Sequence, residues 1–455
     1  MSSSTKKSFP GGVHPADQKE LTADSAIQQI APPKQVAILL SQHIGAPNHP
    51  TVKKRDTVEI GQVIGTTDAF VSSPVHSPVN GTVKDIALRS HPVLGRTEAI
   101  VIDTDEENPG IKTPVADRFD ASFDENKFTA QQIGDAIKNA GIVGMGGAGF
   151  PTRVKVEPDT EPKKHTMLIN ACECEPYITC DYRVMLEWTY QFIAGIKLAK
   201  KISGCKRVCI GVEDNKTEAL QVLKEAIEKA SPDFELIPLQ TKYPQGGEKQ
   251  LIKAVLDQDV PLGGIPPQIG LLVMNVATCA AIAEAVVLDQ PLTHRALTVT
   301  GHGINSPGNF YVPIGTPIQE IIDLCGGLKD SAVKVILGGP MMGFAVGDLS
   351  TPVTKTCGSI LVLSKDEISK AKFERKQTPC IRCGRCLEVC PANINPTKIA
   401  HSVKHNMLDL AEQYHMAACI ECGCCSYICP ANIEITGHIK TGKVLKARQQ
   451  KKMPK

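Results

Sequence analysis

Two copies of one cysteine pattern carry the clearest chemistry in this sequence. The run 380–391 reads Cys-Ile-Arg-Cys-Gly-Arg-Cys-Leu-Glu-Val-Cys-Pro, and the run 419–430 repeats its spacing, C-x2-C-x2-C-x3-C-P. Three thiolates on one tight loop can hold three corners of a [4Fe–4S] cluster, and the fourth cysteine of such a run ligates a neighbouring cluster. The pattern therefore predicts two [4Fe–4S] clusters, which transfer single electrons.

The spacing also predicts which thiols share a cluster, because each fourth cysteine crosses to the other cluster. One set is Cys380, Cys383, Cys386 and Cys429, and the other is Cys390, Cys419, Cys422 and Cys425. Cysteine pairs also bind tetrahedral zinc, but two full copies of this motif favour iron–sulfur clusters. Cys424 lies inside the second run as an extra thiol.

The other cysteines need a separate explanation. The chain has 17 cysteines, an odd number, and its start lacks the apolar core of a signal peptide, so metal ligation in a reducing compartment is favoured over disulfides. Cys172 and Cys174 lie in a polar segment and are expected to be free thiols. Six more are expected to be small buried apolar residues: Cys180, Cys205, Cys209, Cys279, Cys325 and Cys357.

A glycine-rich stretch could bind a phosphate or a flat ring. It reads Gly144-Met-Gly146-Gly147-Ala-Gly149-Phe150-Pro-Thr. Glycines let backbone N–H groups approach such a ligand closely. The stretch matches G-x-G-x-x-G, but it follows a predicted helix instead of a strand and so departs from the usual dinucleotide fingerprint. Taken alone, it could equally be a flexible loop.

Three polar segments follow predicted strands and should meet at one edge of a sheet. They are Asn170-Ala-Cys-Glu173-Cys-Glu175-Pro, Tyr243-Pro-Gln-Gly246-Gly-Glu248 and Met274-Asn275-Val-Ala-Thr278. Ligands of α/β domains bind at the carboxyl ends of the strands. The segments therefore indicate a binding site that the glycine-rich stretch could complete.

The elements that must position these segments alternate in type over 128–290. Strands are predicted at 166–170, 207–212, 234–239 and 271–275, and helices at 131–140, 183–202, 217–229, 246–257 and up to 288. This alternation predicts a Rossmann-like α/β domain with a mainly parallel sheet covered by helices. A small α+β module is expected at 296–350 and a charged linker at 366–379.

The remaining segments frame these domains. Residues 35–110 show short β-branched runs between turn residues, including Asn80-Gly81, a strong hairpin signal. Two such half-motifs resemble the lipoyl/biotinyl-type sandwich barrel, but that family's attachment lysine is absent from the turn 66–74, so we expect a structural barrel. The N-terminal segment 1–34 is predicted to be largely irregular, and 441–455 to be a basic, solvated tail.

Composition excludes two classes of partner. The net charge of +2, from 50 basic and 48 acidic residues in a chain of 455, gives no field to attract nucleic acid. Aromatic residues are only 4%, which argues against a surface for stacking bases. The most apolar stretch, 269–288, contains Asn275, Thr278 and Glu284, so a strand and a helix are expected there instead of a membrane span.

The site motifs together resemble the FMN- and NADH-binding subunit of respiratory complex I. That family has a Gly-x-Gly-Gly-Ala-Gly-Phe-Pro-Thr loop followed by a lysine, here Lys155, and this chain departs from its later motifs at Cys172, Gly247 and Ala277. The resemblance implies FMN among Gly144, Gly146, Gly147, Lys155, Asn170, Asn275 and Thr278. It implies NAD(H) toward Phe150, Glu173, Glu175 and Glu248, with Gly149 and Gly246 completing the cofactor-binding set.

Over about residues 9–440, the order of motifs resembles the RnfC family, which belongs to the Rnf ion-translocating electron-transport complex. The shared motifs begin with Phe9-Pro-Gly-Gly-Val-His14-Pro and Gln42-His43-Ile-Gly-Ala-Pro47. The resemblance implies a barrel, the FMN/NADH domain, a soluble-ligand-binding β-grasp (SLBB) module at 296–350 and a helical two-cluster ferredoxin module at 366–440. His14 and His43 are assigned no chemistry.

That family would make the chain part of an enzyme, an ion-translocating NAD:ferredoxin oxidoreductase. Electrons would pass between NAD(H), FMN and the two clusters, coupled to Na+ or H+ transport, and no acid–base catalytic residue is required. The implied partners are the other subunits of the complex, with ferredoxin engaged indirectly. The implied location is peripheral, on the cytoplasmic face of the bacterial inner membrane.

Two other functions fit parts of the pattern. The cobalamin reductase of bacterial microcompartments resembles this layout, and reduction of cobalamin by NADH without membranes would identify it; the Gly-Gly-Val-His-Pro start favours the Rnf family. A non-enzymatic electron-carrying scaffold would show cluster absorbance without flavin and no bleaching by NADH.

Overall fold

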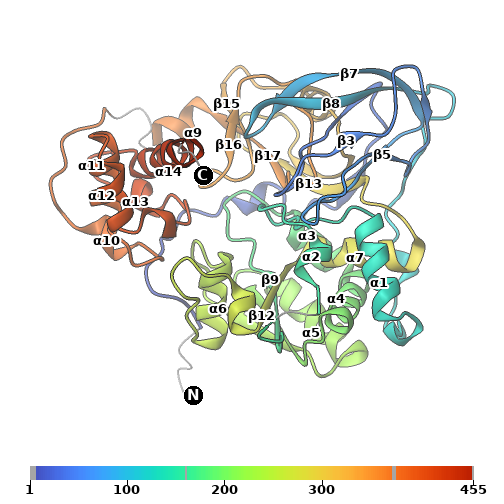
Figure 1. Ribbon diagram of the computed structural model, residues 1–455, viewed down its shortest axis with the longest axis horizontal. Coiled ribbons are helices and arrows are strands. Elements are labelled where there is room, and N and C mark those ends of the chain that lie inside the picture. Colours follow the sequence, from blue (N-terminus) through green and yellow to red (C-terminus); the bar gives the residue numbers. More distant parts are fainter. Residues whose placement is uncertain (1–6, 159–160, 371–375, 453–455) are drawn as a thin grey trace.

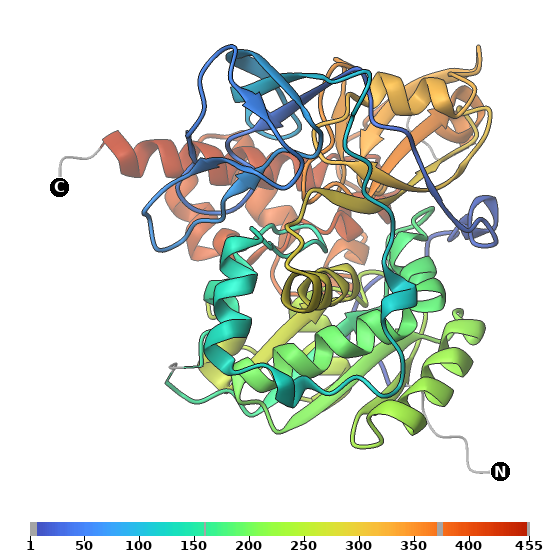
Figure 2. The same ribbon diagram turned by 90° about the vertical axis from the view of Figure 1, so that its right-hand side faces the viewer.

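The computed structural model describes residues 7–158, 161–370 and 376–452. Figure 1 shows four parts: an α/β domain, a β barrel, a β-grasp module and a helical module that carries the cysteine runs. In Figure 2, the barrel and the β-grasp module lie side by side over one end of the α/β domain. This is the multidomain α/β architecture that the sequence predicts.

The α/β domain is built on a parallel sheet with the strand order β11-β10-β9-β12. The strands are β9 (Thr166–Ala171), β10 (Arg207–Glu213), β11 (Glu235–Leu239) and β12 (Leu271–Asn275). The order reverses between β9 and β12, because β10 and β11 extend from one side of β9 and β12 lies on its other side. Ligands of open α/β sheets bind at such a reversal, outside the carboxyl ends of the strands.

Helices cover both faces of this sheet. They are α1 (Ala130–Asn139), α2 (Thr152–Lys155), α3 (Cys180–Glu187), α4 (Thr189–Ser203), α5 (Thr217–Ala230), α6 (Glu248–Leu256) and α7 (Val276–Leu288). Successive residues of a strand point to opposite faces. Met167 and Ile169 of β9 therefore join the large core with α4 and α7, whereas Leu168 joins the smaller core with α6.

The single helix predicted at 183–202 is wrong, because Trp188 breaks it into α3 and α4. The backbone of Trp188 has φ −117° and ψ 33°, outside the helical region. After the break, α4 lies directly on α7. Gly195 makes this contact possible, since a Cβ atom there would stand 1.7 Å from the carbonyl oxygen of Cys279.

The barrel consists of two sheets, β2-β8-β7-β4 and β3-β5-β6, around an aliphatic core. Its strands are β2 (Gln35–Leu39), β3 (His49–Pro50), β4 (Thr57–Val58), β5 (Val63–Thr66), β6 (Val75–His76), β7 (Gly81–His91) and β8 (Gly95–Thr104). Asn80-Gly81 is not a hairpin turn, because β6 and β7 belong to different sheets. The Asn80 side chain instead accepts a hydrogen bond from the N–H of Ile60.

The β-grasp sheet has the order β1-β14-β13-β17-β15-β16 and recruits strands from outside 296–350. Its elements are β1 (Ile27–Gln29), β13 (His294–Thr300), β14 (Gly308–Pro313), α8 (Ile318–Leu324), β15 (Ala332–Leu337), β16 (Phe344–Val346) and β17 (Ser359–Ser364). The prediction of an irregular N-terminal segment was wrong for β1, which pairs in parallel with β14. So short a segment gives no alternating pattern, and only this neighbour defines the strand.

The cysteine module is helical. After α9 (Lys365–Lys370) and residues 371–375, which lie outside the described part, come α10 (Arg385–Glu388), α11 (Pro396–Lys404), α12 (Leu408–Gln413), α13 (Cys424–Tyr427) and α14 (Ile435–Lys452). The tail predicted at 441–455 continues α14 up to Lys452 and is solvated only in part, since residues 447–450 are exposed whereas Gly442 is buried. Gly442 lies against Val403 and Met416, and Leu445 packs on the module's core. Abundant lysines concealed this apolar stripe. None of the described helices is both long and apolar enough to cross a membrane.

Candidate functional site

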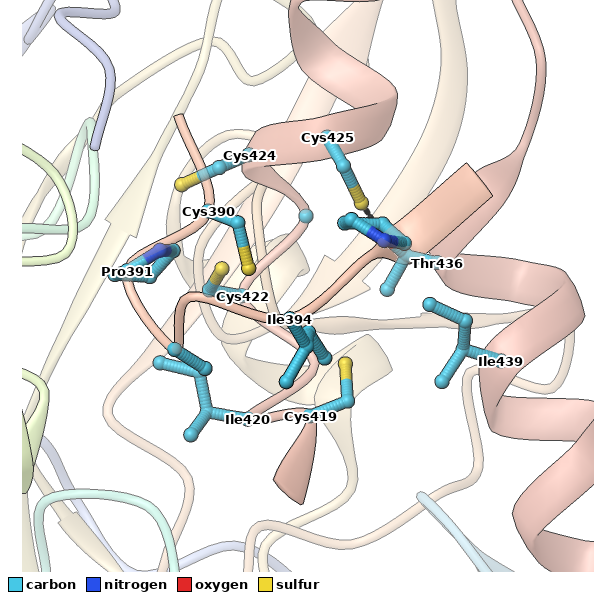
Figure 3. A pocket seen from close by; sticks show the side chains of 13 residues that line it. Cys390, Pro391, Ile394, Cys419, Ile420, Cys422, Cys424, Cys425, Thr436 and Ile439 are labelled. Atoms are coloured by element: carbon cyan, nitrogen blue, oxygen red, sulfur yellow. Dashed lines mark hydrogen bonds between the residues drawn. The ribbon is translucent and has the colours of Figure 1, made fainter. Parts of the chain in front are cut away.

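Five thiols from both cysteine runs line one pocket of the cysteine module: the four of one predicted ligand set, and Cys424. Cys390 ends the first run, and Cys419, Cys422 and Cys425 belong to the second. In Figure 3, their sulfurs face a common space bordered by aliphatic side chains such as Ile394. Cys390, Cys422 and Cys425 are each only 7% exposed. The structure thus brings together one of the two predicted ligand sets, called the inner cysteines below.

The other predicted set, called the outer cysteines, lies nearer the surface. Cys380 and Cys383 are exposed, and Cys386 and Cys429 are half-buried. The sulfur of Cys386 lies 2.7 Å from the hydroxyl oxygen of Thr397. The two sets therefore differ strongly in their access to solvent.

The loops that carry the two sets repeat their backbone conformation 39 residues apart (419 − 380 = 39). Arg382 and Glu421 have φ of 56° and 58°, and each donates its N–H to the first sulfur of its run over 3.4 Å. Gly384 and Gly423 follow with φ of 78° and 82°, where glycine carries no steric cost. Both loops aim amides at sulfur, and such hydrogen bonds tune an iron–sulfur cluster.

The donor atoms of these loops fit iron–sulfur clusters. Each predicted set contains four thiols and no oxygen or nitrogen ligand, and soft thiolates favour such clusters. Among the described His, Cys, Asp and Glu side chains, no group of three is arranged to hold a single metal ion. The assignment of the eight cysteines to two clusters remains our prediction.

Cys424 is the fifth thiol of this pocket. Its side chain is fully buried, and its thiol is hydrogen-bonded to that of Cys422. The sulfur lies 3.9 Å from the carbonyl oxygen of Tyr243, in the α/β domain. The extra thiol therefore belongs to the contact between the two parts of the chain.

Where the strand order of the parallel sheet reverses, Asn170 and Asn275 lie side by side at the ends of β9 and β12. The side-chain amide of Asn170 donates to the carbonyl of Gly246 over 2.7 Å. The side-chain oxygen of Asn275 caps α7 by accepting the N–H of Thr278. Three segments that the sequence predicted to meet therefore do so at this edge.

The glycine-rich stretch is held against the same edge. The N–H of Met145 donates to the Thr278 hydroxyl over 2.9 Å, and a Cβ atom on Gly146 would stand 3.1 Å from the Asn275 amide nitrogen. Gly146, Gly147 and Ala148 are exposed, and nothing lies within 4 Å of the Cβ position of Gly147. Within the described residues, no hydrogen bond uses the N–H groups of these three residues. Such open donors fit the phosphate or the ring of FMN.

The other predicted cofactor residues surround this edge. Lys155 and Glu248 form an ion pair with an Nζ–Oε1 distance of 3.1 Å, and both are partly exposed. Gly149 is buried, and Phe150 beside it is half-buried. The ion pair places the lysine and the acid predicted for FMN and NAD(H), respectively, next to each other.

Glu173 and Glu175 are engaged by backbone groups. The carboxylate of Glu173 accepts the N–H of Asp181 over 2.6 Å, and that of Glu175 accepts the N–H groups of Met341 and Met342. Burial raises the pKa of both carboxyls, that of Glu175 to about 7. In this structure the two acids fix the loop to α3 and to the β-grasp module, and their role toward NAD(H) stays a prediction.

Sequence reasoning missed several residues that support the site. Asp181 accepts the side-chain amide of Asn275 over 2.6 Å. Lys19 is buried and donates from Nζ to the carbonyls of Glu173 and Glu175, both over 3.0 Å. A lysine in a polar segment gives no sequence signal of burial, whereas Asp181 could have been found from its place in the first turn of a helix after the Glu173 segment.

The barrel also supports the glycine-rich stretch. The N–H of Ile44 donates to the carbonyl of Gly149 over 3.0 Å. The buried Lys355 donates from Nζ to the carbonyls of Pro74, in the barrel, and Gly141, before the glycine-rich stretch, both over 2.6 Å. Burial lowers the pKa of Lys355 to about 7. The Gln42-to-Pro47 motif, which had no predicted role, thus lies at the edge of the candidate site.

The inner cysteines lie against the same edge of the α/β domain. The phenol of the buried Tyr243 donates to the carbonyl of Cys422 over 2.8 Å. Gln250 donates to the carbonyl of Pro391 over 3.1 Å. The N-terminal segment crosses this contact at Gly12 and Val13, called the N-terminal strap below, and the N–H of Gly12 donates to the carbonyl of Val389 over 2.9 Å. The candidate cofactor edge and the inner pocket therefore form one continuous contact.

Four family models match successive parts of the chain. Residues 7–107 match the RnfC barrel sandwich hybrid domain, and residues 137–284 match the Nuo51 FMN-binding domain. Residues 297–345 match the SLBB domain, and residues 372–430 match a 4Fe-4S dicluster domain. These matches confirm the predicted kinds of domain and their order. They include the predicted FMN-binding domain and the predicted domain with two [4Fe–4S] clusters.

Whole-chain relatives agree, and all three described here are the subunits designated C of their complexes. The chain is 42% identical to that of the proton-translocating ferredoxin:NAD(+) oxidoreductase complex of Clostridium ljungdahlii, over 87% of this chain and 84% of that protein. It is also 42% identical to that of the Na(+)-translocating complex of Acetobacterium woodii, over 89% of both. The relative from the ion-translocating oxidoreductase complex of Vibrio cholerae is 36% identical over 89% of this chain and 51% of that longer protein.

Solved structures show the same fold at low sequence identity. An NAD+-reducing [NiFe]-hydrogenase matches in its air-oxidized state with a TM-score of 0.50 and 19% identity, covering 68% of this chain and 57% of that one. The H2-reduced state matches with a TM-score of 0.51 and 19% identity, covering 74% and 64%. This likeness concerns the fold.

Proposed function

Because the chain belongs to the RnfC family, whose relatives are subunits of ion-translocating ferredoxin:NAD+ oxidoreductase complexes, we propose that it transfers electrons between NAD(H) and the rest of such a complex. The matching domains are of FMN-binding and 4Fe-4S types. The chain would thus be one part of an enzyme coupled to Na+ or H+ translocation.

This proposal rests above all on the contact between the two candidate redox sites. The edge that holds Asn170 and Asn275 continues through Tyr243 to the inner cysteines, and the outer cysteines then reach the surface. Electron transfer requires cofactors in such a sequence of close neighbours. If the nucleotide edge and the cysteine module lay far apart, electrons could not pass between them in this way.

The residues that would hold FMN are those of the open glycine-rich stretch together with Lys155, Asn170, Asn275 and Thr278. Bound there, FMN would accept an electron pair from a nicotinamide and pass electrons singly to the clusters. The chain's own groups would bind and orient: the N–H groups of Gly146 and Gly147 are open, and Lys155 supplies a positive charge. At Gly246 the backbone passes closely between Asn170 and Cys174, and a side chain there would contact both.

The place of the chain in the cell follows from the proposed complex. It would bind the other subunits peripherally, on the cytoplasmic face of the membrane, where NAD(H) and ferredoxin are found. The surface around the outer cysteines suits a partner that receives or supplies electrons, because Cys380 and Cys383 are exposed there. Ferredoxin itself would be engaged through other subunits.

An anaerobic preparation tests this function. Iron, sulfide, zinc and flavin are measured, and NADH is then added. We expect about eight irons per chain from two four-iron clusters, one FMN, and bleaching of the flavin and cluster absorbance. Zinc in place of iron would contradict the proposal. Clusters without flavin or bleaching would indicate the scaffold, and cobalamin reduction by the chain alone would indicate the microcompartment enzyme.

A matched pair of variants links that result to the glycine-rich stretch. Gly146→Val should abolish flavin binding and bleaching by NADH, because its Cβ would meet the Asn275 amide at 3.1 Å. Dithionite should still reduce its clusters. Gly347→Val is the control, since its Cβ would meet no atom within 4 Å in the β-grasp module. A flavin-replete Gly146→Val protein would contradict the placement of FMN.

A further inference from the structure

Tyr243 occupies the contact between the nucleotide edge and the inner cysteines. It is 1% exposed, and its backbone N–H and carbonyl both pair with Val13 of the N-terminal strap, over 2.9 and 2.8 Å. Its phenol donates to the carbonyl of Cys422 over 2.8 Å. Val13, Cys422 and Cys424 pack with it in one buried cluster. Its hydrogen bond and its packing therefore fix the orientation of the side chain.

The other end of the same short segment reaches the proposed flavin site. Three residues after Tyr243, the N–H of Gly246 donates to the sulfur of Cys174 over 3.2 Å, and its carbonyl accepts the amide of Asn170. Residues 243–246 thus span from a proposed cofactor-binding residue to the backbone of an inner cysteine through bonded or hydrogen-bonded atoms. In the described structure this segment joins the two sites directly.

We propose that Tyr243 is the positioning residue for electron transfer between the flavin site and the inner cluster. Its hydroxyl fixes the Cys422 loop against the nucleotide edge, so that the two cofactors keep one separation. A donor beside a ligand's carbonyl also stabilises the additional negative charge of a reduced cluster. The inference rests on the proposed function and assigns a specific role in it to Tyr243.

The electrons of this step balance. One NADH supplies two electrons, which cross the contact singly, one for each cluster. NAD+ is the oxidised product, the two clusters are reduced by one electron each, and the proton of the transferred hydride is released to water. Tyr243 forms and breaks no covalent bond.

Tyr243→Phe removes the hydroxyl and leaves the ring, and Tyr177→Phe is its matched control. Tyr177 is also buried in the α/β domain, and its phenol donates over 2.7 Å to Glu367 of another part of the chain. That bond involves none of the cysteine loops. Both variants lose a phenol that bonds to another part of the chain, but only Tyr243→Phe loses a hydrogen bond to a proposed cluster ligand. The Tyr243 phenol also hydrogen-bonds the side chain of Glu175.

Rapid mixing of the full chain with NADH, followed by potentiometric titration of the clusters, tests the inference. Tyr243→Phe should keep its iron, its FMN and its rate of flavin reduction, but reduce its clusters about ten-fold more slowly and at a lower inner-cluster potential. Tyr177→Phe should match the wild type. Equal rates and potentials in the two variants would overturn the inference, and so would loss of iron from Tyr243→Phe. Clusters that NADH does not reduce in the wild type would overturn the proposed function itself.

Discussion

The two cysteine loops have the same backbone, but they lie in different surroundings. Each donates an amide to its first sulfur over 3.4 Å and then turns at a glycine with φ of 78° or 82°. The inner loop packs on the α/β domain through Tyr243, whereas Cys380 and Cys383 of the outer loop are exposed. The two loops thus share one backbone conformation, and they differ only in which other parts of the chain pack on them.

Residues 39 positions apart show how the sequence adapts each loop. Arg385 of the outer loop corresponds to Cys424 of the inner loop (385 + 39 = 424). Cys424 is fully buried beside Tyr243, where an arginine would bury an unpaired charge at a cost of several kcal/mol, on the order of 3–5. The extra thiol in the second run therefore marks the loop that faces the α/β domain.

A second pair of corresponding positions, which is charged in both loops, also differs according to the surroundings of the loop. Arg382 of the outer loop corresponds to Glu421 of the inner loop (382 + 39 = 421). Glu421 pairs with Lys443 of α14 over 2.8 Å, and Lys443 also donates to the carbonyl of Cys419. The inner loop is fixed by its own chain, whereas the outer loop presents the exposed Arg382 to solvent. We infer that the inner cysteines hold the cluster that receives electrons from the flavin site, and that the outer cysteines hold the cluster that exchanges them with a partner.

The largest expected effect is on the rate of cluster reduction when one predicted ligand is removed from the inner or from the outer set of cysteines. Cys422→Ser should lower the rate of cluster reduction by NADH by more than about 100-fold, because even outer-shell partners of metal ligands contribute 10- to 100-fold. Cys383→Ser should leave the inner cluster reducible by NADH. Absorbance after anaerobic mixing with NADH, with the iron content of each variant, measures both effects.

The two variants control each other, since each should retain one cluster and about four irons. FMN content should equal that of the wild type in both. Equal reduction by NADH in the two variants would contradict a difference between the inner and outer clusters, and loss of reduction in Cys383→Ser alone would reverse their order.

A smaller effect tests the difference in burial. Oxygen or a chelator should remove the outer cluster several-fold faster than the inner one, because Cys380 and Cys383 are exposed and three inner cysteines are 7% exposed. Spectra and iron analysis over the course of limited exposure would follow the loss. Two clusters that decay together would show that the two sets of cysteines are equally accessible and would remove the basis of the comparison.

The sequence was most informative where the chemistry is local. Cysteine spacing predicted that Cys390 groups with Cys419, Cys422 and Cys425, and strand ends predicted that Asn170 meets Asn275. Contacts across the chain were not predictable. Nothing in a polar N-terminal segment indicates that Lys19 is buried under Glu173, and nothing in Tyr243 indicates that its hydroxyl reaches Cys422, because these partners lie 154 and 179 positions away.

The order in which the two clusters are reduced is the sharpest test of the proposed electron path. The wild-type chain is mixed rapidly with an equimolar amount of NADH, frozen at successive times and examined by electron paramagnetic resonance, with Cys383→Ser supplying the spectrum of the inner cluster alone. We expect the inner signal to appear first and the outer signal to follow, until both clusters are reduced. An outer signal that appears first, or reduction of the outer cluster in Cys422→Ser at the wild-type rate, would contradict this path.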